Sequence, residues 1–284
     1  MNITKAVITA AGPDQRTLPL QTLVAHDGVS RSALELIARE AVDAGAEEIA
    51  VIVHAKDEDR YAEAAGDVAD RIRFLIQPEP RGYGHALACA REFVGDDSFL
   101  HLVGDHLTVP ASDTPCARQL VEVAKTEACS VSGVRASRES LLPYYGVVGG
   151  RPMAGRTDLY RVECVREKPA PTQAEQELAV PGLRAGFYLC FFGMHVLTPA
   201  IMELLDDEVS RARPGDSIPL SPSLDALCRR EQFFALEIAG ERYNIGRTYG
   251  TFYAQLALAL QGEDREEILA QLIDMLASRH AAPT

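Results

Sequence analysis

Length, composition and charge set the broad class of this chain. Its 284 residues are 47% hydrophobic and 24% charged, which excludes a disordered protein and suffices for one large domain. The formal net charge of −13 excludes nonspecific nucleic-acid binding, because that binding needs a basic surface to displace counterions.

The first third of the chain alternates β-rich runs with helical patterns, which is typical of βαβ units and a mainly parallel sheet. The apolar runs predicted to be strands cover residues 5–12, 49–53, 73–77 and 99–103. Between the first two, apolar residues recur at helical spacing. Ser32 and Glu35 form a potential capping box for that helix, and Gly45 is placed to end it. A second helix over 84–92 is expected to join the last two strands.

The rest of the chain continues to mix strands and helices. Further strands are predicted over 130–134, 146–148, 159–165 and 187–192. Helices are predicted to begin near Thr198-Pro199, near Ser221-Pro222 and after Thr248; in the first two, proline stands at the first helical position, where it is favoured. An amphipathic helix is expected over 264–279, and the proline-containing stretch 169–182 is interpreted as a surface excursion.

The six cysteines indicate an intracellular protein. None stands in a C-x-x-C pair, so a zinc site is poorly supported and the thiols are interpreted as small buried hydrophobes. No signal peptide and no apolar run of about 20 residues is present, so we expect a cytoplasmic location and no membrane partner.

Polar groups follow several of the predicted strands at the point where each strand ends. In an open α/β sheet, ligands bind beyond the carboxyl ends of the strands. The Gly12 loop, Gln77 and Asp105 each stand directly after such a strand. This clustering predicts a pocket at one edge of the sheet.

Two glycine-containing loops are candidates for binding a nucleotide. In the first, backbone N–H groups around Gly12 can approach a phosphate that Arg16 pairs with; the alternative is an ordinary βα turn with a solvated arginine. In the second, two glycines flank Tyr83 directly before a helix, and the amide of Gln77 suits the edge of a pyrimidine. The alternative for the second is a tight loop with a cap.

Two charged sites are candidates for holding phosphate and metal. Asp105 ends a buried strand and is a natural Mg²⁺ ligand when phosphates supply other oxygens, although a turn aspartate is an equal alternative. Glu167 and Lys168 point to opposite faces of an extended segment. Both can contact one ligand if the chain bends at Pro169; the alternative is a solvated charge pair.

In this order, the segments resemble the bacterial UTP–glucose-1-phosphate uridylyltransferase (UDP-glucose pyrophosphorylase) family of sugar-nucleotide nucleotidyltransferases from about Lys5 to Gly250. The strongest match is Gln77 to Ala86, which is similar to the family's Q-G-x-x-K/R-G-x-G-H-A segment. Further matches are Gly104-Asp105, Tyr145-Gly-Val-Val148, Glu167-Lys168-Pro169, Phe192-Gly193 and Gly215-Asp216 with the following Leu220 to Leu227.

The resemblance implies a fold and a division of the chain. The fold is α/β and Rossmann-like, with a mainly parallel central sheet flanked by helices and a sugar-binding β-rich insertion. A single domain over 1–284 would hold the nucleotide with about 1–135 and the sugar with about 136–250, and would end in helices over about 248–284. A homodimer or homotetramer is expected.

The resemblance also implies a reaction. The phosphate of glucose 1-phosphate attacks the α-phosphorus of UTP in line, UDP-glucose forms and pyrophosphate leaves, with Mg²⁺ as cofactor. The implied roles are nucleotide binding for Ala11, Gly12, Gln77 and Gly82, sugar binding for Gly146, Glu167 and Gly193, metal binding for Asp105, and catalytic phosphate contacts for Arg16 and Lys168.

Three positions depart from the family pattern. Asp14 replaces a glycine, Gln21 stands where a catalytic lysine is expected, and Asn244 replaces a metal-binding aspartate. All three changes weaken the triphosphate and metal end. Two alternatives therefore stay open: a weak or inactive regulatory protein that binds a sugar nucleotide, and a nucleotidyltransferase for another pair, such as dTTP with a different sugar 1-phosphate.

Overall fold

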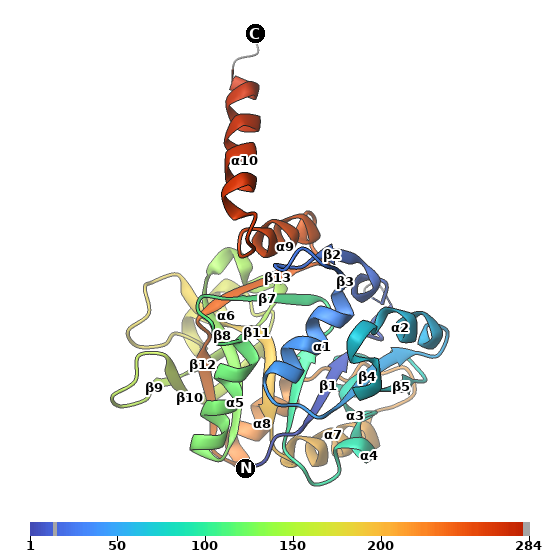
Figure 1. Ribbon diagram of the computed structural model, residues 1–284. Coiled ribbons are helices and arrows are strands. Elements are labelled where there is room, and N and C mark those ends of the chain that lie inside the picture. Colours follow the sequence, from blue (N-terminus) through green and yellow to red (C-terminus); the bar gives the residue numbers. More distant parts are fainter. Residues whose placement is uncertain (14–15, 281–284) are drawn as a thin grey trace.

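A nine-stranded mixed sheet runs through the molecule (Figure 1). The computed structural model describes residues 1–13 and 16–280. The strand order is β5-β4-β1-β6-β11-β8-β12-β10-β9. The strands are β1 (Lys5–Thr9), β4 (Glu48–His54), β5 (Ile72–Gln77), β6 (Phe99–Val103), β8 (Ser130–Arg138), β9 (Gly146–Pro152), β10 (Leu159–Glu167), β11 (Phe187–Leu197) and β12 (Phe233–Glu237).

The sheet has a parallel half and a largely antiparallel half. Strands β5, β4, β1 and β6 are all parallel, as the sequence predicts. Strand β11 then joins β6 in the antiparallel direction, and only β8 and β12 are parallel beyond it. The predicted α/β class is confirmed, but the β-rich segment extends the same sheet and forms no separate layer.

Helices cover both faces of the sheet because its central strands are apolar on both sides. In β1, Ala6 and Ile8 belong to one hydrophobic cluster and Val7 to the other. The first cluster is covered by α1 (Ala33–Asp43), α2 (Glu58–Ala64) and α5 (Cys116–Glu127). The second is covered by α3 (Tyr83–Ala88), α4 (Arg91–Val94), α7 (Ala200–Arg211) and α8 (Ser221–Arg230).

Smaller elements complete the fold. Two-stranded ribbons form from β2 (Thr22–Val24) with β3 (Ser30–Ser32) and from β7 (His106–Pro110) with β13 (Gly240–Asn244). The remaining elements are η1 (Leu18–Leu20), η2 (Gly66–Arg71), η3 (Glu139–Tyr144), α6 (Pro171–Glu177), α9 (Gly250–Ala259) and α10 (Arg265–His280). Helix α10 extends away from the body of the molecule (Figure 1).

Residues at the two ends of α1 correctly predict where this helix begins and ends. The hydroxyl of Ser32 accepts the backbone N–H of Glu35 at 2.9 Å, so the predicted N-cap is confirmed. The Glu35 carboxylate does not close the capping box, because it pairs with Arg31 and Arg39 instead. Gly45 has φ 104° just beyond the helix, where residues other than glycine are strained.

One local prediction was wrong and another was incomplete. The single helix expected over 84–92 is divided into α3 and α4, since the backbone turns at Cys89 and Ala90. The stretch 169–182 is more than a surface excursion, because α6 begins at Pro171 and buries Ala174 against a third hydrophobic cluster. Proline at the first helical position is compatible with this start.

The cysteines were expected to be small buried hydrophobes, and the structure shows this for half of them. Each cysteine is a free thiol; three are buried and three are partly buried. Over residues 1–13 and 16–280, no helix combines the length and the apolar character that crossing a membrane would require.

A pair of buried histidines lies at the centre of the sheet. His101 of β6 and His195 of β11 are direct partners across the two strands, and their rings stack at 5.9 Å. The Nδ1–H of His101 donates to the carbonyl oxygen of Val7 at 2.9 Å, so its Nε2 accepts the hydroxyl of Tyr83 at 2.6 Å. Burial lowers the pKa of His101 to about 4.

This burial predicts an acid-sensitive fold. His101 is neutral in the folded chain but titrates near pH 6.5 in the unfolded chain, so its contribution to stability is lost as the pH falls from about 6.5 towards 4. The loss should reach about 2 kcal/mol at pH 5. Urea unfolding should show that the free energy of unfolding falls between pH 7.5 and pH 5. This fall should be about 2 kcal/mol smaller in His101→Asn than in the wild-type protein. An equal drop in both proteins would contradict the assignment.

Candidate functional site

The carboxyl ends of the parallel strands meet at one edge of the sheet. Strand β1 ends at Thr9 and β6 at Val103, and the N–H of Gly104 donates to the carbonyl oxygen of Thr9 at 2.9 Å. A Cβ atom at Gly104 would lie only 2.8 Å from that oxygen. Glycine therefore lets the two strand ends approach, which sets the loop at Ala11 beside Asp105.

The segment from Gln77 to Ala86, here called the base loop, follows β5. The Nε2 amide of Gln77 donates to the carbonyl oxygen of Gly82 at 3.2 Å and lies 3.0 Å from Nδ1 of His85. Gly82 has φ 102°. The buried amide is thus held at both hydrogens, and its orientation is set by the loop itself.

Asp105 and Asn244 form an oxygen-rich centre next to the base loop. Burial acts to raise the pKa of Asp105, but the charge and the hydrogen bond of His106, with Nδ1 2.8 Å from Oδ1, hold that pKa below its usual value. Asn244 pairs with His106 across β13 and β7. A Cβ atom on Gly246 would lie 3.1 Å from Oδ1 of Asn244 and 3.6 Å from Oδ2 of Asp105. The two side-chain oxygens therefore lie close to one glycine.

This centre suits a Mg²⁺ ion that takes most of its ligands from phosphate and water. Asp105 is an ionised carboxylate whose Oδ2 is not the oxygen bonded to His106, and Asn244 adds a neutral oxygen. Mg²⁺ is often held by one or two carboxylates together with substrate phosphates. Among the described residues no group of three or more histidine, cysteine or acidic side chains could hold a metal.

A second group of predicted residues lies where β9 and β10 meet. Gly146 and Glu167 are direct partners in the two strands, and Oε2 of Glu167 accepts the hydroxyl of Ser221 at 2.6 Å. A Cβ atom at Gly146 would lie 2.7 Å from the ring of Phe191 and 3.1 Å from Glu167. Glycine at 146 is therefore required for Phe191 and Glu167 to pack this closely.

Lys168 follows Glu167 in a strained turn. Its φ of 45° lies in the left-handed region. Its N–H donates to the carbonyl oxygen of Tyr145 at 3.2 Å. Its Nζ lies 3.9 Å from Glu167 and its side chain is 56% exposed, so the ammonium is available to an incoming anion.

Contacts connect these groups into one site. A Cβ atom on Gly193 would lie 3.3 Å from the ring of His106, and that ring lies 6.3 Å from the ring of Tyr145. Burial raises the pKa of Tyr83 in the base loop, and the charges of Asp105 and Glu167 raise it further. The predicted nucleotide, metal and sugar groups therefore converge at one edge of the sheet.

Arg16 and Gln21 make contacts with other parts of the protein. Nε of Arg16 is 3.2 Å from Oδ2 of Asp57, a buried carboxylate, so the guanidinium is paired within the protein. Gln21 accepts the hydroxyl of Thr251 at 2.8 Å and ties its segment to α9. Asp14 lies outside the described residues.

Two arginines support the site through contacts that sequence reasoning did not predict. Arg242 stacks on the ring of Tyr145 at 3.7 Å, and Arg247 stacks on the ring of Tyr144 at 4.2 Å. Such cation–π contacts join segments about 100 residues apart, and an arginine in a short strand gives no local signal of its distant aromatic partner.

A cavity of about 990 Å³ lies beside the Asp105 centre. It shares Val103, His106 and Gly193 with the site and extends between α1, β7 and the segment that joins α9 to α10. Its walls do not include Gln77, Gly82, Glu167 or Lys168. The cavity is therefore a neighbour of the candidate site and does not enclose it.

The packing of Gly82 yields a stability test. A Cβ atom there would lie 2.8 Å from the hydroxyl of Ser217 and 3.0 Å from the carbonyl oxygen of Ile218. Gly45 has a similar φ of 104° but nothing within 4 Å. Gly45→Ala should cost only the backbone strain, about 1–3 kcal/mol, and Gly82→Ala should cost clearly more because steric overlap is added. Urea unfolding of both variants would show this, and equal losses would be inconsistent with the tight packing.

Comparisons with known proteins agree with this geometry. The model of the nucleotidyl transferase family matches residues 5–210. The chain is 31% identical to the UTP–glucose-1-phosphate uridylyltransferase YngB of Bacillus subtilis, over 96% of each chain. It is 29% identical to a second UTP–glucose-1-phosphate uridylyltransferase of B. subtilis, over 98% of each chain.

Solved structures share the fold. A UTP-bound UDP-glucose pyrophosphorylase from Acinetobacter baumannii superposes with a TM-score of 0.72 at 24% identity, covering 96% of this chain and 99% of the other. A UDP-glucose pyrophosphorylase in complex with UDP-glucose gives a TM-score of 0.70 at 20% identity, covering 90% and 98%. The family match over most of the chain and the full-length relatives together establish that this chain belongs to the nucleotidyl transferase family, among its UTP–glucose-1-phosphate uridylyltransferases.

Proposed function

We propose that this protein condenses UTP with glucose 1-phosphate to give UDP-glucose and pyrophosphate. The observation that carries the proposal is the convergence of the base loop, the Asp105 centre and the Glu167–Lys168 turn at one edge of the sheet. In-line transfer of this kind depends on holding two anionic substrates in register and neutralising their charge, rather than on a protein nucleophile.

The nucleotide is placed by the parallel half of the sheet, in about residues 1–135. Gln77 and Gly82 would hold the uracil, because the oriented amide and the nearby backbone can hydrogen-bond to the edge of a pyrimidine. The backbone at Ala11 and Gly12 would face the nucleotide as well, beside the close contact of Gly104 with Thr9.

The sugar phosphate is placed by about residues 136–250. Gly146 and Gly193 would face the hexose, because each packs too tightly against its neighbours to carry a side chain, and the carboxylate of Glu167 can accept hydroxyls of the sugar. Lys168 would pair with the phosphate and keep the attacking oxygen near the α-phosphorus.

Mg²⁺ would supply charge neutralisation on the triphosphate, with Asp105 and Asn244 as its protein ligands. Because Asn244 is neutral, the site carries one carboxylate less than the family pattern. Arg16 would reach the departing phosphates only after its contact with Asp57 changes.

The comparisons support this reaction over the two alternatives. The full-length relatives that reach 29–31% identity are named for UTP and glucose 1-phosphate. Neither a different nucleotide nor a purely regulatory role is favoured by these relatives.

A turnover assay tests the proposal. Purified protein with Mg²⁺, each nucleoside triphosphate and several sugar 1-phosphates should release pyrophosphate most efficiently with UTP and glucose 1-phosphate. Asp105→Asn should lower kcat about 10²–10³-fold, since it removes the one charged metal ligand while keeping the side-chain size. Faster turnover with dTTP, or no turnover with any pair although UDP-glucose raises the melting temperature, would refute the proposal.

We also propose that α10 joins two copies of this chain. Its apolar residues recur at helical spacing, and Ile273 and Leu276 are 63% and 58% exposed on a helix that leaves the body of the molecule. An isolated helix of this length is marginal in water, and a second copy would cover the apolar stripe.

Light scattering after size-exclusion chromatography tests the assembly. The protein should elute at a multiple of its 30.8 kDa chain mass. Replacing Ile273 and Leu276 together by Asp should shift the mass to that of one chain, because two charges would have to be buried in the interface. A wild-type protein that runs as a monomer would overturn this assembly.

A further inference from the structure

The half of β10 that leads to Lys168 has a strand neighbour on one side only. Strand β12 pairs with β10 at Leu159–Arg161 and goes no further. Strand β9 continues beside β10 as far as Glu167. The backbone groups on the uncovered side must find other partners, because an unpaired buried N–H is costly.

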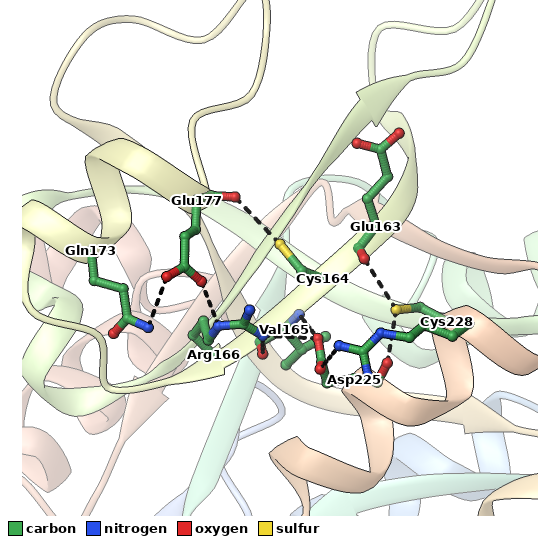
Figure 2. Close-up of polar contacts among 9 residues, drawn as sticks. Glu163, Cys164, Val165, Arg166, Gln173, Glu177, Asp225 and Cys228 are labelled. Carbon is green, nitrogen blue, oxygen red and sulfur yellow. Dashed lines mark hydrogen bonds and ion pairs between the residues drawn. The ribbon is translucent and has the colours of Figure 1, made fainter.

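Helix α8 supplies those partners from a single face. Ser221, Asp225 and Cys228 are spaced by four and three residues, so they line one side of the helix. The carboxylate Oδ1 of Asp225 accepts the N–H of Val165 at 2.9 Å. The thiol of Cys228 lies 3.4 Å from the carbonyl oxygen of Glu163 and 3.0 Å from the carbonyl oxygen of Asp225 in its own helix, so both acceptors are within reach of its one hydrogen (Figure 2). The helix thus takes the place of a missing strand.

Asp225 is the centre of this contact. Its Oδ1 also accepts Nη1 of Arg166 at 3.0 Å, and Nε of Arg166 donates to Glu177 of α6 at 2.6 Å (Figure 2). The side chain of Asp225 is 14% exposed. The Asp225 carboxylate therefore accepts the backbone N–H of Val165 and the guanidinium of Arg166, the two residues that directly precede Glu167.

The segment before α8 holds the base loop. The N–H of Ile218 donates to the carbonyl oxygen of Arg81 at 2.6 Å, and the N–H of His85 donates back to Ile218 at 3.2 Å. The guanidinium of Arg81 donates to the carbonyl oxygen of Arg213 at 3.2 Å. Residues 213–230, here called the brace, therefore contact both halves of the site.

We infer that the brace sets the distance between the base loop and the sugar-phosphate turn, and that Asp225 is a positioning residue for Lys168. The inference rests on the proposed function. Lys168 has a left-handed backbone, which persists only where its surroundings determine it. Its side chain is largely exposed, so its location depends on the backbone anchors at Tyr145 on one side and Asp225 on the other.

Three variants at Asp225 and its partner test this role kinetically. Asp225→Ala should raise the KM for glucose 1-phosphate about 10–100-fold and leave the KM for UTP within about threefold, because a displacement of about 1 Å is enough to lose such a factor. Asp225→Asn should recover most of the loss, since its Oδ1 can still accept the N–H of Val165. Arg229→Ala should change neither constant, because Arg229 is an exposed partner of the same carboxylate.

Matched variants calibrate the result. Asp207→Ala on α7 also removes an aspartate paired with an arginine four residues away, but it lies outside the brace and should have no effect on either KM. The Lys168→Ala variant shows how far the KM for glucose 1-phosphate rises when the phosphate contact itself is removed. Equal increases in both KM values for Asp225→Ala, or no increase, would overturn the inference.

Hydrogen exchange gives a readout that does not depend on turnover. The amides of residues 163–168 should exchange at least tenfold faster in Asp225→Ala and remain near wild type in Asp225→Asn and Asp207→Ala, while α1 is unchanged. Unchanged exchange at 163–168 would overturn the role of Asp225 even in an active enzyme. If the wild-type protein is inactive with every substrate pair but the variants show this exchange pattern, the proposed reaction is refuted and the positioning role of the brace is kept.

Discussion

The site depends on the burial of β1 between β4 and β6, with apolar side chains on both of its faces. This packing brings the ends of parallel strands to one edge, and the absence of a side chain at Gly104 lets the loop after β6 bond to Thr9. Asp105 is presented beside the Ala11 loop as a result. The base loop reaches the same edge because β5 lies in the same parallel half.

Electrostatics shape what this edge can bind. The chain carries a net charge of −13, so polyanionic substrates need local positive charge or a divalent cation. Asp105 stays ionised because His106 outweighs the effect of burial on its pKa, and Asn244 contributes an oxygen without a second charge. Lys168 remains exposed on the opposite side of the site, whereas Arg16 is held by Asp57. The sugar end is thus closer to its working arrangement than the triphosphate end.

The two halves of the site are joined by packing rather than by sequence neighbourhood. The base loop and the Glu167–Lys168 turn follow strands from opposite ends of the strand order. Strand β5 is the first in that order, and β10 is next to the last. The brace contacts both, and the stacking of Arg242 on Tyr145 adds a third connection from β13. A precise distance between substrates therefore depends on α8 and β13 as much as on the residues expected to touch them.

Sequence alone determined the parallel half of the sheet and the capped start of α1, because apolar periodicity, glycines and caps act between near neighbours, and it predicted the residues of the candidate site. It also indicated the family through ordered short motifs. Only the tertiary structure decided that the β-rich segment extends the same sheet, that Pro171 opens a helix that buries Ala174 and that Arg16 pairs with Asp57. It alone revealed Asp225 as the partner of Val165. These contacts join residues far apart in the chain, and no local pattern of charge or hydrophobicity specifies which distant group will satisfy a given donor.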